Sequence, residues 1–377
     1  MVATEQIWIW QQDAWPAFTW QDRELVKLLR EINQLQGRLV GRSAATGESQ
    51  SQESQMEALL DNAINTSAIE GEELNVESVR SSLARRLGIN QAGLPAGTPQ
   101  TDGLSDVLMD ATRHPNEPLS LDRLFRWHEW LFPHGHEGLT PIRVGELRGE
   151  DPMQVVSGPV GKSKIHFEAP PRKNLESELN QFLEWFHQSR VQVDPDPLVR
   201  AGVAHLWFVT LHPFDDGNGR LARAITDLAL AQAEQQSVRF YAMSATIMEN
   251  RKAYYTVLEN TQRGGMDVTP WLVWFLSMLK ETLQVADRRI EYVLKKATYW
   301  QQHGQSALNE RQIKVLNRLL DAGPDGFEGG INARKYMNLA NVSKATATRD
   351  LAGLVEKGCL VQREGGGRST SYDITWA

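Results

Sequence analysis

The sequence predicts a mostly α-helical protein with a β-hairpin in its middle and a small helical module with a second hairpin at its end. Apolar residues recur at helical spacing through much of the chain, as in 25–39 and 199–211. Strand-like patterns occur between Pro141 and Pro171 and again after Gly358. A few short strands among long helical stretches favour a helical core over a sheet-based fold.

Composition excludes several classes of protein. The 377 residues, of which 41% are hydrophobic, suffice for two or three domains with packed cores. The net charge of −7 argues against binding nucleic acid or a membrane over the whole surface. Cys359 is the single cysteine, which excludes an internal disulfide and a cysteine-based zinc site. With neither a signal-peptide pattern nor a membrane-length apolar stretch, we expect a cytoplasmic protein without membrane contacts.

The first element is an arm rich in aromatic residues. We expect its rings to clamp an irregular segment onto another surface, with a ligand-binding role as the weaker alternative. A helix follows from Asp22, a candidate cap, through Leu39. The tryptophans of the arm are Trp8, Trp10, Trp15 and Trp20.

The next segments alternate between breakers and helices. Residues 43–55, rich in Ser, Gln and Glu, indicate a linker or a mobile turn. Helical periodicity resumes over 56–64, and a Gly/Pro-rich stretch, 88–103, precedes further helices. Helices are also predicted at 175–186 and 198–211, and in segments around Tyr254 and Trp271.

A β-hairpin is predicted before the second half of the chain. Its first strand is Val155, Val156, Ser157 and Gly158, and its second is 164–167. The glycines and proline of 158–161 form the turn. A simple surface hairpin is the alternative to a functional one.

The most informative string is His-Pro-Phe-Asp-Asp-Gly-Asn-Gly-Arg, residues 212–220. It lies between two apolar helical runs, so it occupies the loop of a helix-loop-helix. Gly217, Asn218 and Gly219 leave room for a phosphate at the amides that open the second helix. Asp216 is a hard oxygen ligand suited to Mg²⁺, and the fork of Arg220 suits phosphate oxygens. His212 is the natural proton acceptor.

Taken singly, these residues are ordinary turn, cap and surface residues, but together with Arg223 they form a specific pattern. The string resembles the signature of the Fic family, His-Pro-Phe-x-Asp/Glu-Gly-Asn-Gly-Arg, at every fixed position. The resemblance implies transfer of AMP from ATP to a protein hydroxyl. It implies that His212 deprotonates the hydroxyl, Asp216 holds Mg²⁺, and Arg220 neutralises the leaving pyrophosphate. Relatives that phosphorylate carry Ala and Lys in place of the two glycines, and this chain keeps both.

The same resemblance assigns roles to further residues. The hairpin would be a flap that adds a target's extended segment as an extra strand over the catalytic histidine. Tyr254, Tyr255 and Gln262 would border the nucleotide, although the family often has Asn at the last position. Core packing is the alternative for both tyrosines.

A second string, Thr-Ser-Ala-Ile-Glu-Gly at 66–71, predicts a helix end. Thr66 and Glu70 share one helix face, and Gly71 ends the helix. A carboxylate at a helix C-terminus is unfavourable, so Glu70 should have a cationic partner. The resemblance implies that Glu70 pairs with Arg223, occupies the place of the γ-phosphate and inhibits the same chain. In some relatives this glutamate instead positions a water that removes AMP.

The chain ends in three predicted helices and a hairpin, which indicates a winged helix. Ser343 caps the third helix, which resembles a DNA-recognition helix. Between Arg334 and Arg368 there are seven basic and three acidic residues. This basic face predicts DNA binding, and the alternative is a module that docks a protein or forms a homodimer.

These observations give one interpretation of the whole chain. Residues 1–90 form a helical region with the inhibitory motif, 91–300 a catalytic domain of the Fic type, and 306–377 a winged helix. The predicted function is AMP transfer from ATP, with Mg²⁺, to a Ser, Thr or Tyr hydroxyl of a protein, including the chain itself as a candidate target. The alternatives are AMP removal at the same site and a nucleotide-sensing DNA-binding regulator.

Overall fold

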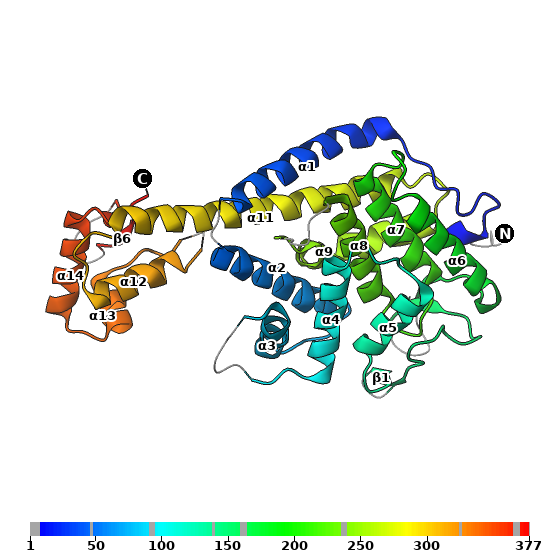
Figure 1. The fold of residues 1–377 in the computed structure, drawn as a ribbon, viewed down its shortest axis with the longest axis horizontal. Coiled ribbons are helices and arrows are strands. Elements are labelled where there is room, and N and C mark those ends of the chain that lie inside the picture. Colours follow the sequence, from blue (N-terminus) through cyan, green and yellow to red (C-terminus); the bar gives the residue numbers. More distant parts are fainter. Residues whose placement is uncertain are drawn as a thin grey trace. The chain divides into compact units, whose positions relative to one another are not determined.

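The computed structural model describes residues 8–45, 48–89, 95–137, 140–158, 164–234, 240–323, 326–364 and 370–376. Helices dominate these residues, as the sequence predicts (Figure 1). The chain divides into a first unit, 1–37 with 51–284, and a second unit, 38–50 with 285–377. Helices α1 (Asp22–Ser43), α2 (Glu48–Ile69) and α11 (Thr269–His303) each contribute residues to both units.

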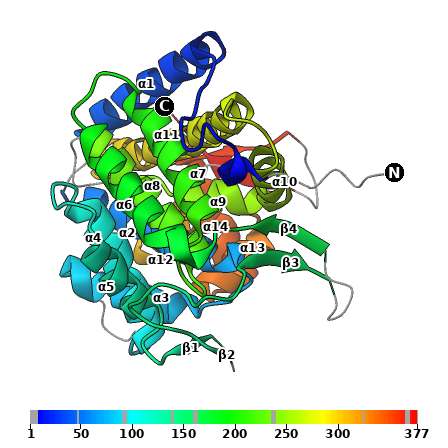
Figure 2. The same ribbon diagram turned by 90° about the vertical axis from the view of Figure 1, so that its right-hand side faces the viewer.

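The helices that lie wholly in the first unit are α3 (Val76–Leu87), α4 (Pro99–Arg113), α5 (Leu121–Leu131), α6 (Arg172–Gln188), α7 (Pro197–Leu211), α8 (Asn218–Glu234), α9 (Met243–Glu249) and α10 (Arg251–Gln262). Its strands are β1 (His136–Glu137), β2 (Thr140–Pro141), β3 (Gln154–Ser157) and β4 (Lys164–Glu168). Helices α7 and α8 lie side by side in the centre of this unit (Figures 1 and 2). Every residue of α7 from Leu198 to Leu211 is buried, which explains its nearly continuous apolar sequence.

The N-terminal arm is clamped by its aromatic rings, as predicted. Trp8 packs edge-on against Phe167 of β4, with ring centroids 5.3 Å apart. Trp15 and Phe18 both contact Trp207 of α7. The arm is thereby fixed against the hairpin and the central helices. Helix α1 begins at Asp22 itself, so this residue lies in the first turn and is not the cap.

The predicted linker at 43–55 is shorter than expected. Helix α2 already begins at Glu48, because Gln, Glu and Ser in series can continue a helix whose apolar face appears only from Met56 onward. Its end matches the prediction: Gly71 has φ +88°, and the amides of Gly71 and Glu72 donate to the carbonyls of Ala68 and Ser67, each at 3.0 Å. These two bonds form a Schellman motif.

The helix α4 also begins earlier than the Gly/Pro-rich stretch suggested. Thr98 caps it and Pro99 occupies its first turn, which is favourable because proline lacks the N–H that would be unpaired there. Glycine at 103 serves close packing, since a Cβ there would lie 1.8 Å from the carbonyl oxygen of Trp130. The glycine therefore marks a helix contact and not a loop.

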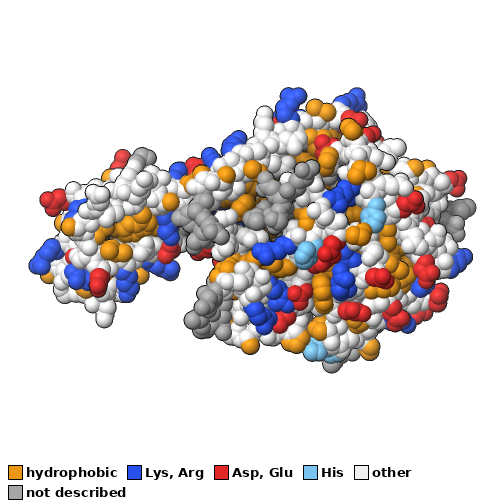
Figure 3. Space-filling model, in the orientation of Figure 1, with side chains coloured by type: hydrophobic (Ala, Val, Ile, Leu, Met, Phe, Trp, Pro, Cys, Tyr) orange, Lys and Arg blue, Asp and Glu red, His pale blue; other side chains and the backbone are white. Residues whose placement is uncertain are grey.

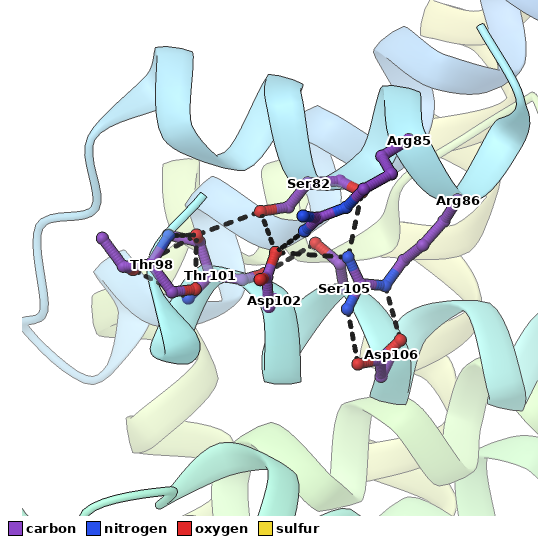
Figure 4. Close-up of polar contacts among 8 residues, drawn as sticks. All are labelled: Ser82, Arg85, Arg86, Thr98, Thr101, Asp102, Ser105 and Asp106. Carbon is purple, nitrogen blue, oxygen red and sulfur yellow. Dashed lines mark hydrogen bonds and ion pairs between the residues drawn. The ribbon is translucent and has the colours of Figure 1, made fainter. Parts of the chain in front are cut away.

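Charged side chains join α3 to α4 (Figure 4). Arg86 donates to both carboxylate oxygens of Asp106 and also pairs with Asp102, at 3.2 Å. Arg85 pairs with Asp102 as well, and the Ser82 hydroxyl donates to it at 2.6 Å. This network fixes α3, and with it the end of the α2–α3 connection, on α4.

The predicted hairpin is present as the antiparallel pair β3–β4, with a bulge between Val155 and Val156. Its turn, including residues 159–161, lies outside the described residues. The pair is a two-stranded sheet that is visible at the side of the first unit in Figure 2. The short pair β1–β2 was not expected from the sequence.

The second unit contains α12 (Glu310–Leu320), α13 (Ala333–Ala340), α14 (Lys344–Glu356), β5 (Leu360–Gln362) and β6 (Tyr372–Ile374). The predicted cap is confirmed, because Ser343 accepts a hydrogen bond from the amide of Thr346. The strands pair antiparallel, and Ile331 forms a further bridge to Tyr372. The glycine turn at 365–367 and Arg368 lie outside the described residues. Tyr299 of α11 belongs to the core of this unit, and its hydroxyl donates to the carbonyl of Cys359 at 3.0 Å.

Basic and acidic side chains are interspersed over the face shown in Figure 3. This distribution agrees with the modest net charge of −7. Among the described residues, no helix has both the length and the apolar content needed to cross a membrane.

Candidate active site

The loop His212–Gly217 connects α7 to α8 and is held by contacts from distant segments. His212 is the C-cap of α7 and has φ +49°, a left-handed conformation that is uncommon for a residue with a side chain. Arg148 fixes this conformation: its Nε donates to the His212 carbonyl at 2.8 Å, and its backbone amide donates to the Pro213 carbonyl at 3.0 Å. No sequence pattern indicates this role of Arg148, because the contact joins residues 64 positions apart in the chain.

The buried side chain of Asn218 holds the loop together through two hydrogen bonds to the backbone of Phe214. Its side-chain oxygen accepts from the amide of Phe214 at 3.0 Å, and its side-chain nitrogen donates to the Phe214 carbonyl at 2.8 Å. Gly217 has φ +78°, and a Cβ there would lie 2.8 Å from the ring of Phe132. Both residues therefore give the loop its shape, whatever ligand it holds.

The imidazole of His212 has the features of a general base. Its Nδ1 lies 3.2 Å from the carbonyl oxygen of Val209, so Nδ1–H donates and Nε2 keeps its lone pair. Burial lowers the pKa of His212 and the nearby Arg148 lowers it further, while the Val209 carbonyl, Glu70 and Asp216 oppose this shift. The imidazole is therefore neutral near pH 7 and can accept a proton.

Glu70 forms the ion pair with Arg223 that was predicted from the resemblance. Arg223 Nη2 donates to Glu70 Oε1 at 2.7 Å, and its Nε donates to the Thr66 hydroxyl at 2.7 Å. Burial raises the pKa of Glu70, but the charge and hydrogen bond of Arg223 and the charge of Arg220 outweigh burial, so this pKa lies below its usual value. A Cβ on Gly219 would lie 2.1 Å from Glu70 Oε1, so this carboxylate covers the Gly219 side of the loop.

Arg220 also lies in the site, and its side chain is 4% exposed. It pairs with Glu72 at 3.0 Å and lies 3.6 Å from Asp216, while its guanidinium carbon lies 4.8 Å from the centre of the Phe132 ring. No sequence pattern indicates this role of Glu72. Both arginines of the motif are thus paired with carboxylates from the segment that follows α2.

Asp216 suits a magnesium ion that arrives with a nucleotide. Mg²⁺ is usually held by one or two carboxylates together with substrate phosphates and water. The Asp216 side chain is 43% exposed, whereas the neighbouring Asp215 is paired with Arg143 at 3.2 Å. Within the described ranges, no group of three or more His, Cys, Asp or Glu residues is arranged to hold a metal. The donor set therefore fits an ion shared with phosphates and not an all-protein metal cage.

His128 on α5 also supports the loop, and no sequence pattern indicates this role. Its Nδ1 accepts from the amide of Gly145 at 3.2 Å, so its Nε2–H donates to the Asp216 carbonyl, also at 3.2 Å. The ring stacks on Phe214, with centroids 4.3 Å apart. Burial lowers the pKa of His128 to about 4, which keeps the ring neutral.

The free energy of unfolding is expected to fall as the pH drops below about 6.5. Burial lowers the pKa of His128 to about 4 and that of His205 to about 3. Unfolded histidine titrates near 6.5, so at intermediate pH the unfolded state binds more protons and stability decreases as pH falls. The two groups together contribute up to about 2.7 kcal/mol per pH unit. Urea unfolding between about pH 7 and pH 5 measures this slope, and the slope should be shallower in His128→Gln; an identical slope would contradict the prediction.

The tyrosines and Gln262 occupy different surroundings. Tyr255 donates from its hydroxyl to the Ile69 carbonyl at 3.2 Å, next to Glu70. Tyr254 is buried and hydrogen-bonds His205 at 2.8 Å. Gln262 is also buried, with its amide donating to the Thr210 hydroxyl at 3.2 Å. Tyr255 therefore contacts the end of α2, whereas Tyr254 and Gln262 form hydrogen bonds to residues of α7.

The hairpin is tied to α10. The ring of His166 on β4 bridges Ser157 of β3 and Glu259 of α10, with both distances 2.6 Å. Arg263 donates to the carbonyls of Ile165 and His166 at 3.0 and 3.2 Å. These contacts position Val155, Val156, Ser157 and Gly158 relative to the first unit.

Two family models match the chain. The Fic/DOC family matches residues 118–230, a range that contains the whole 212–220 string. A domain of unknown function, DUF4172, matches residues 8–89, which include Glu70 and Glu72. In both ion pairs of the site, the glutamate lies in the DUF4172 range and the arginine lies in the Fic/DOC range.

Several curated proteins are similar to the chain. A uridine 5′-monophosphate transferase from Xanthomonas campestris is 33% identical over 121 residues, which are 30% of this chain and 21% of that protein. Fic protein adenylyltransferases from Nematostella vectensis and Aedes aegypti are each 24% identical, over 60% and 61% of this chain and 48% and 42% of their own. The chain thus matches about a fifth to a half of the length of these relatives.

Solved structures share the fold. A Fic family protein from Desulfovibrio desulfuricans has a TM-score of 0.54 at 19% identity and covers 96% of this chain and 98% of its own. A Fic domain-containing signaling protein from Bacteroides thetaiotaomicron has a TM-score of 0.52 at 16% identity, over 69% of this chain and 97% of its own. The family match and the related sequences agree with this shared fold. We conclude that this chain contains a Fic/DOC domain homologous to Fic protein adenylyltransferases.

Proposed function

We propose that the protein transfers AMP from ATP to a Ser, Thr or Tyr hydroxyl of a protein. The observation that carries this proposal is the neutral His212 imidazole beside a glycine-containing helix N-terminus and two buried arginines. The target hydroxyl would attack the α-phosphorus while the bond to the bridging oxygen breaks. The hydroxyl proton passes to His212 Nε2, and pyrophosphate leaves.

The remaining residues bind and orient. The amides at 217–219 and the guanidinium groups of Arg220 and Arg223 would hold phosphate oxygens, and Asp216 would hold the Mg²⁺ that accompanies ATP. When bound, the ion adds positive charge at the phosphates. In this proposal, residues 1–90 carry the inhibitory motif, 91–300 form the catalytic domain, and Glu70 restrains the site by occupying Arg223.

Mass spectrometry tests the activity. The chain is incubated with Mg-ATP, alone and with a cell lysate, and peptides are searched for added AMP on Ser, Thr or Tyr. A parallel incubation with UTP is needed because one relative is named a uridine 5′-monophosphate transferase. AMP adducts that require His212 support the proposal. UMP adducts alone would show that the enzyme uses UTP as its nucleotide substrate and not ATP.

The hairpin is proposed to align targets by main-chain pairing, since β3 and β4 pair only with each other in the described sheet. We therefore expect Val156→Pro, which removes an amide donor from an exposed position, to lower modification of a protein target several-fold. Target labelling is compared with that of Val193→Pro, a matched change in an exposed loop residue outside the sheet. Equal labelling by the two variants would assign the hairpin a purely structural role.

The second unit is proposed to be a winged helix that binds duplex DNA weakly, because Lys344 and Arg349 are exposed on α14. We expect the full chain to bind DNA at low salt and to lose binding as salt rises. Replacing both residues by alanine should weaken binding, measured by fluorescence anisotropy. The control replaces Lys314 and Arg318 of α12, which removes the same charge. No binding, or an equal loss in both variants, would favour docking of a protein or a homodimer.

A further inference from the structure

The ion pair between Arg220 and Glu72 is shielded from solvent. The Nη1–Oε2 distance is 3.0 Å, and the side chains are 4% and 13% exposed. The ring of Phe132 lies against the guanidinium. Because salt and water screen such a pair less than a surface pair, Glu72 holds Arg220 more firmly than an exposed carboxylate could.

The fold orients Glu72 from several sides. Its backbone amide donates to the Ser67 carbonyl in the turn that ends α2. Its Oε1 accepts from the side chain of Gln100 on α4, and its Oε2 accepts from Arg220. With both oxygens engaged and the backbone fixed, the direction of this carboxylate is set by α2 and α4 together.

Glu70 and Glu72 each bind one of the two arginines of the motif. Glu70 binds Arg223 at 2.7 Å and Glu72 binds Arg220 at 3.0 Å. A guanidinium N–H that donates to a carboxylate is not available to a phosphate oxygen in the same direction. Phosphates that use both arginines must therefore compete with two carboxylates and not with one.

The segment that carries both glutamates is anchored beyond them as well. Asn75 caps α3, and α3 is joined to α4 by the pairs of Arg85 and Arg86 with Asp102 and Asp106 (Figure 4). Gln100, which contacts Glu72, lies on the same helix α4. Residues 70–75 are thus tethered at both ends, which keeps Glu72 within reach of Arg220.

We propose that Glu72 is a second inhibitory carboxylate, which occupies Arg220 as Glu70 occupies Arg223. This inference rests on the proposed function, because it assigns Arg220 to the nucleotide phosphates. It predicts that removing either carboxylate relieves the restraint in part. Full release requires both glutamates to leave their arginines.

Nucleotide affinity tests Glu72 separately from catalysis. His212→Ala serves as the background, so that ATP is bound without being consumed, and calorimetry gives the Kd for Mg-ATP. We expect Glu72→Gln to tighten ATP binding about tenfold, since the charge that competes with phosphate is removed while the side-chain shape is kept. Glu73→Gln is the matched control, because Glu73 is exposed beside Glu72.

Three further variants keep the test decisive. Gln100→Ala, which loosens Glu72 without removing it, should shift the Kd in the same direction by a smaller factor. With His212 intact, Glu70→Gly/Glu72→Gln should transfer AMP faster than Glu70→Gly alone. If Glu72→Gln binds ATP no more tightly than Glu73→Gln, the role of Glu72 is overturned even when Glu70→Gly is activated. If Glu70→Gly is not activated, the restraint by Glu70 is wrong, and the Kd comparison still decides the role of Glu72.

Discussion

Replacing His212 by alanine is expected to lower AMP transfer by about 10²- to 10⁴-fold, the usual cost of losing a general base. The structure gives the reason: Nδ1–H is bound to the Val209 carbonyl, so Nε2 is the atom that can accept the proton of the attacking hydroxyl. Arg220 donates to Glu72 and Arg223 donates to Glu70, so residues other than His212 orient the two arginines. ATP binding should therefore change little.

Incorporation of label from α-³²P-ATP into protein measures the rate, and calorimetry measures ATP affinity. His187→Ala, at an exposed position of α6, is the control for general effects of losing a histidine. A variant with wild-type transfer would show that His212 is not the base. A variant that lost ATP affinity to the same extent as transfer would show that His212 acts in binding.

The local part of the site could be predicted from the sequence because the residues are neighbours in the chain. The C-cap of α7 at His212, the end of α2 at Gly71 and the cap at Ser343 each involve backbone contacts between residues within about one turn of each other. Turn and cap chemistry is determined at that range. The helical periodicity of α7 likewise follows from its burial.

The supporting contacts could not be predicted, because their partners are far apart in sequence. Arg148 reaches the loop across 64 residues, His128 across 88 and Glu72 across 148. A single Arg, His or Glu on a helix or loop carries no periodic signal, since such residues are usually solvated. The Fic resemblance supplied Glu70–Arg223 but not these residues. The predicted starts of α2 and α4 were wrong for a different reason. Their polar and glycine-containing segments resemble linkers in composition, but tertiary contacts determine that they are helical.

Replacing Glu70 by glycine is expected to raise AMP transfer, at least several-fold. The carboxylate covers Gly219 and binds Arg223, so phosphate must displace it to reach this arginine. Without it, Arg223 keeps its bonds to the Thr66 hydroxyl and carbonyl, which hold the guanidinium in place for phosphate. Glu70→Gly thus removes the carboxylate that competes with phosphate for Arg223, while the hydrogen bonds from Arg223 to Thr66 remain.

A gain of activity is diagnostic because most single substitutions are neutral or harmful. Labelled-ATP incorporation by Glu70→Gly is compared with that by Glu73→Gly, the same change at an exposed neighbour. The same pair of variants tests AMP removal from a modified target: if removal is the main activity, Glu70→Gly should abolish it, because the carboxylate that would orient the attacking water is lost. If Glu70→Gly neither gains transfer nor loses hydrolysis, then Thr66 to Gly71 forms a well-capped helix end whose ion pair with Arg223 contributes only to the fold.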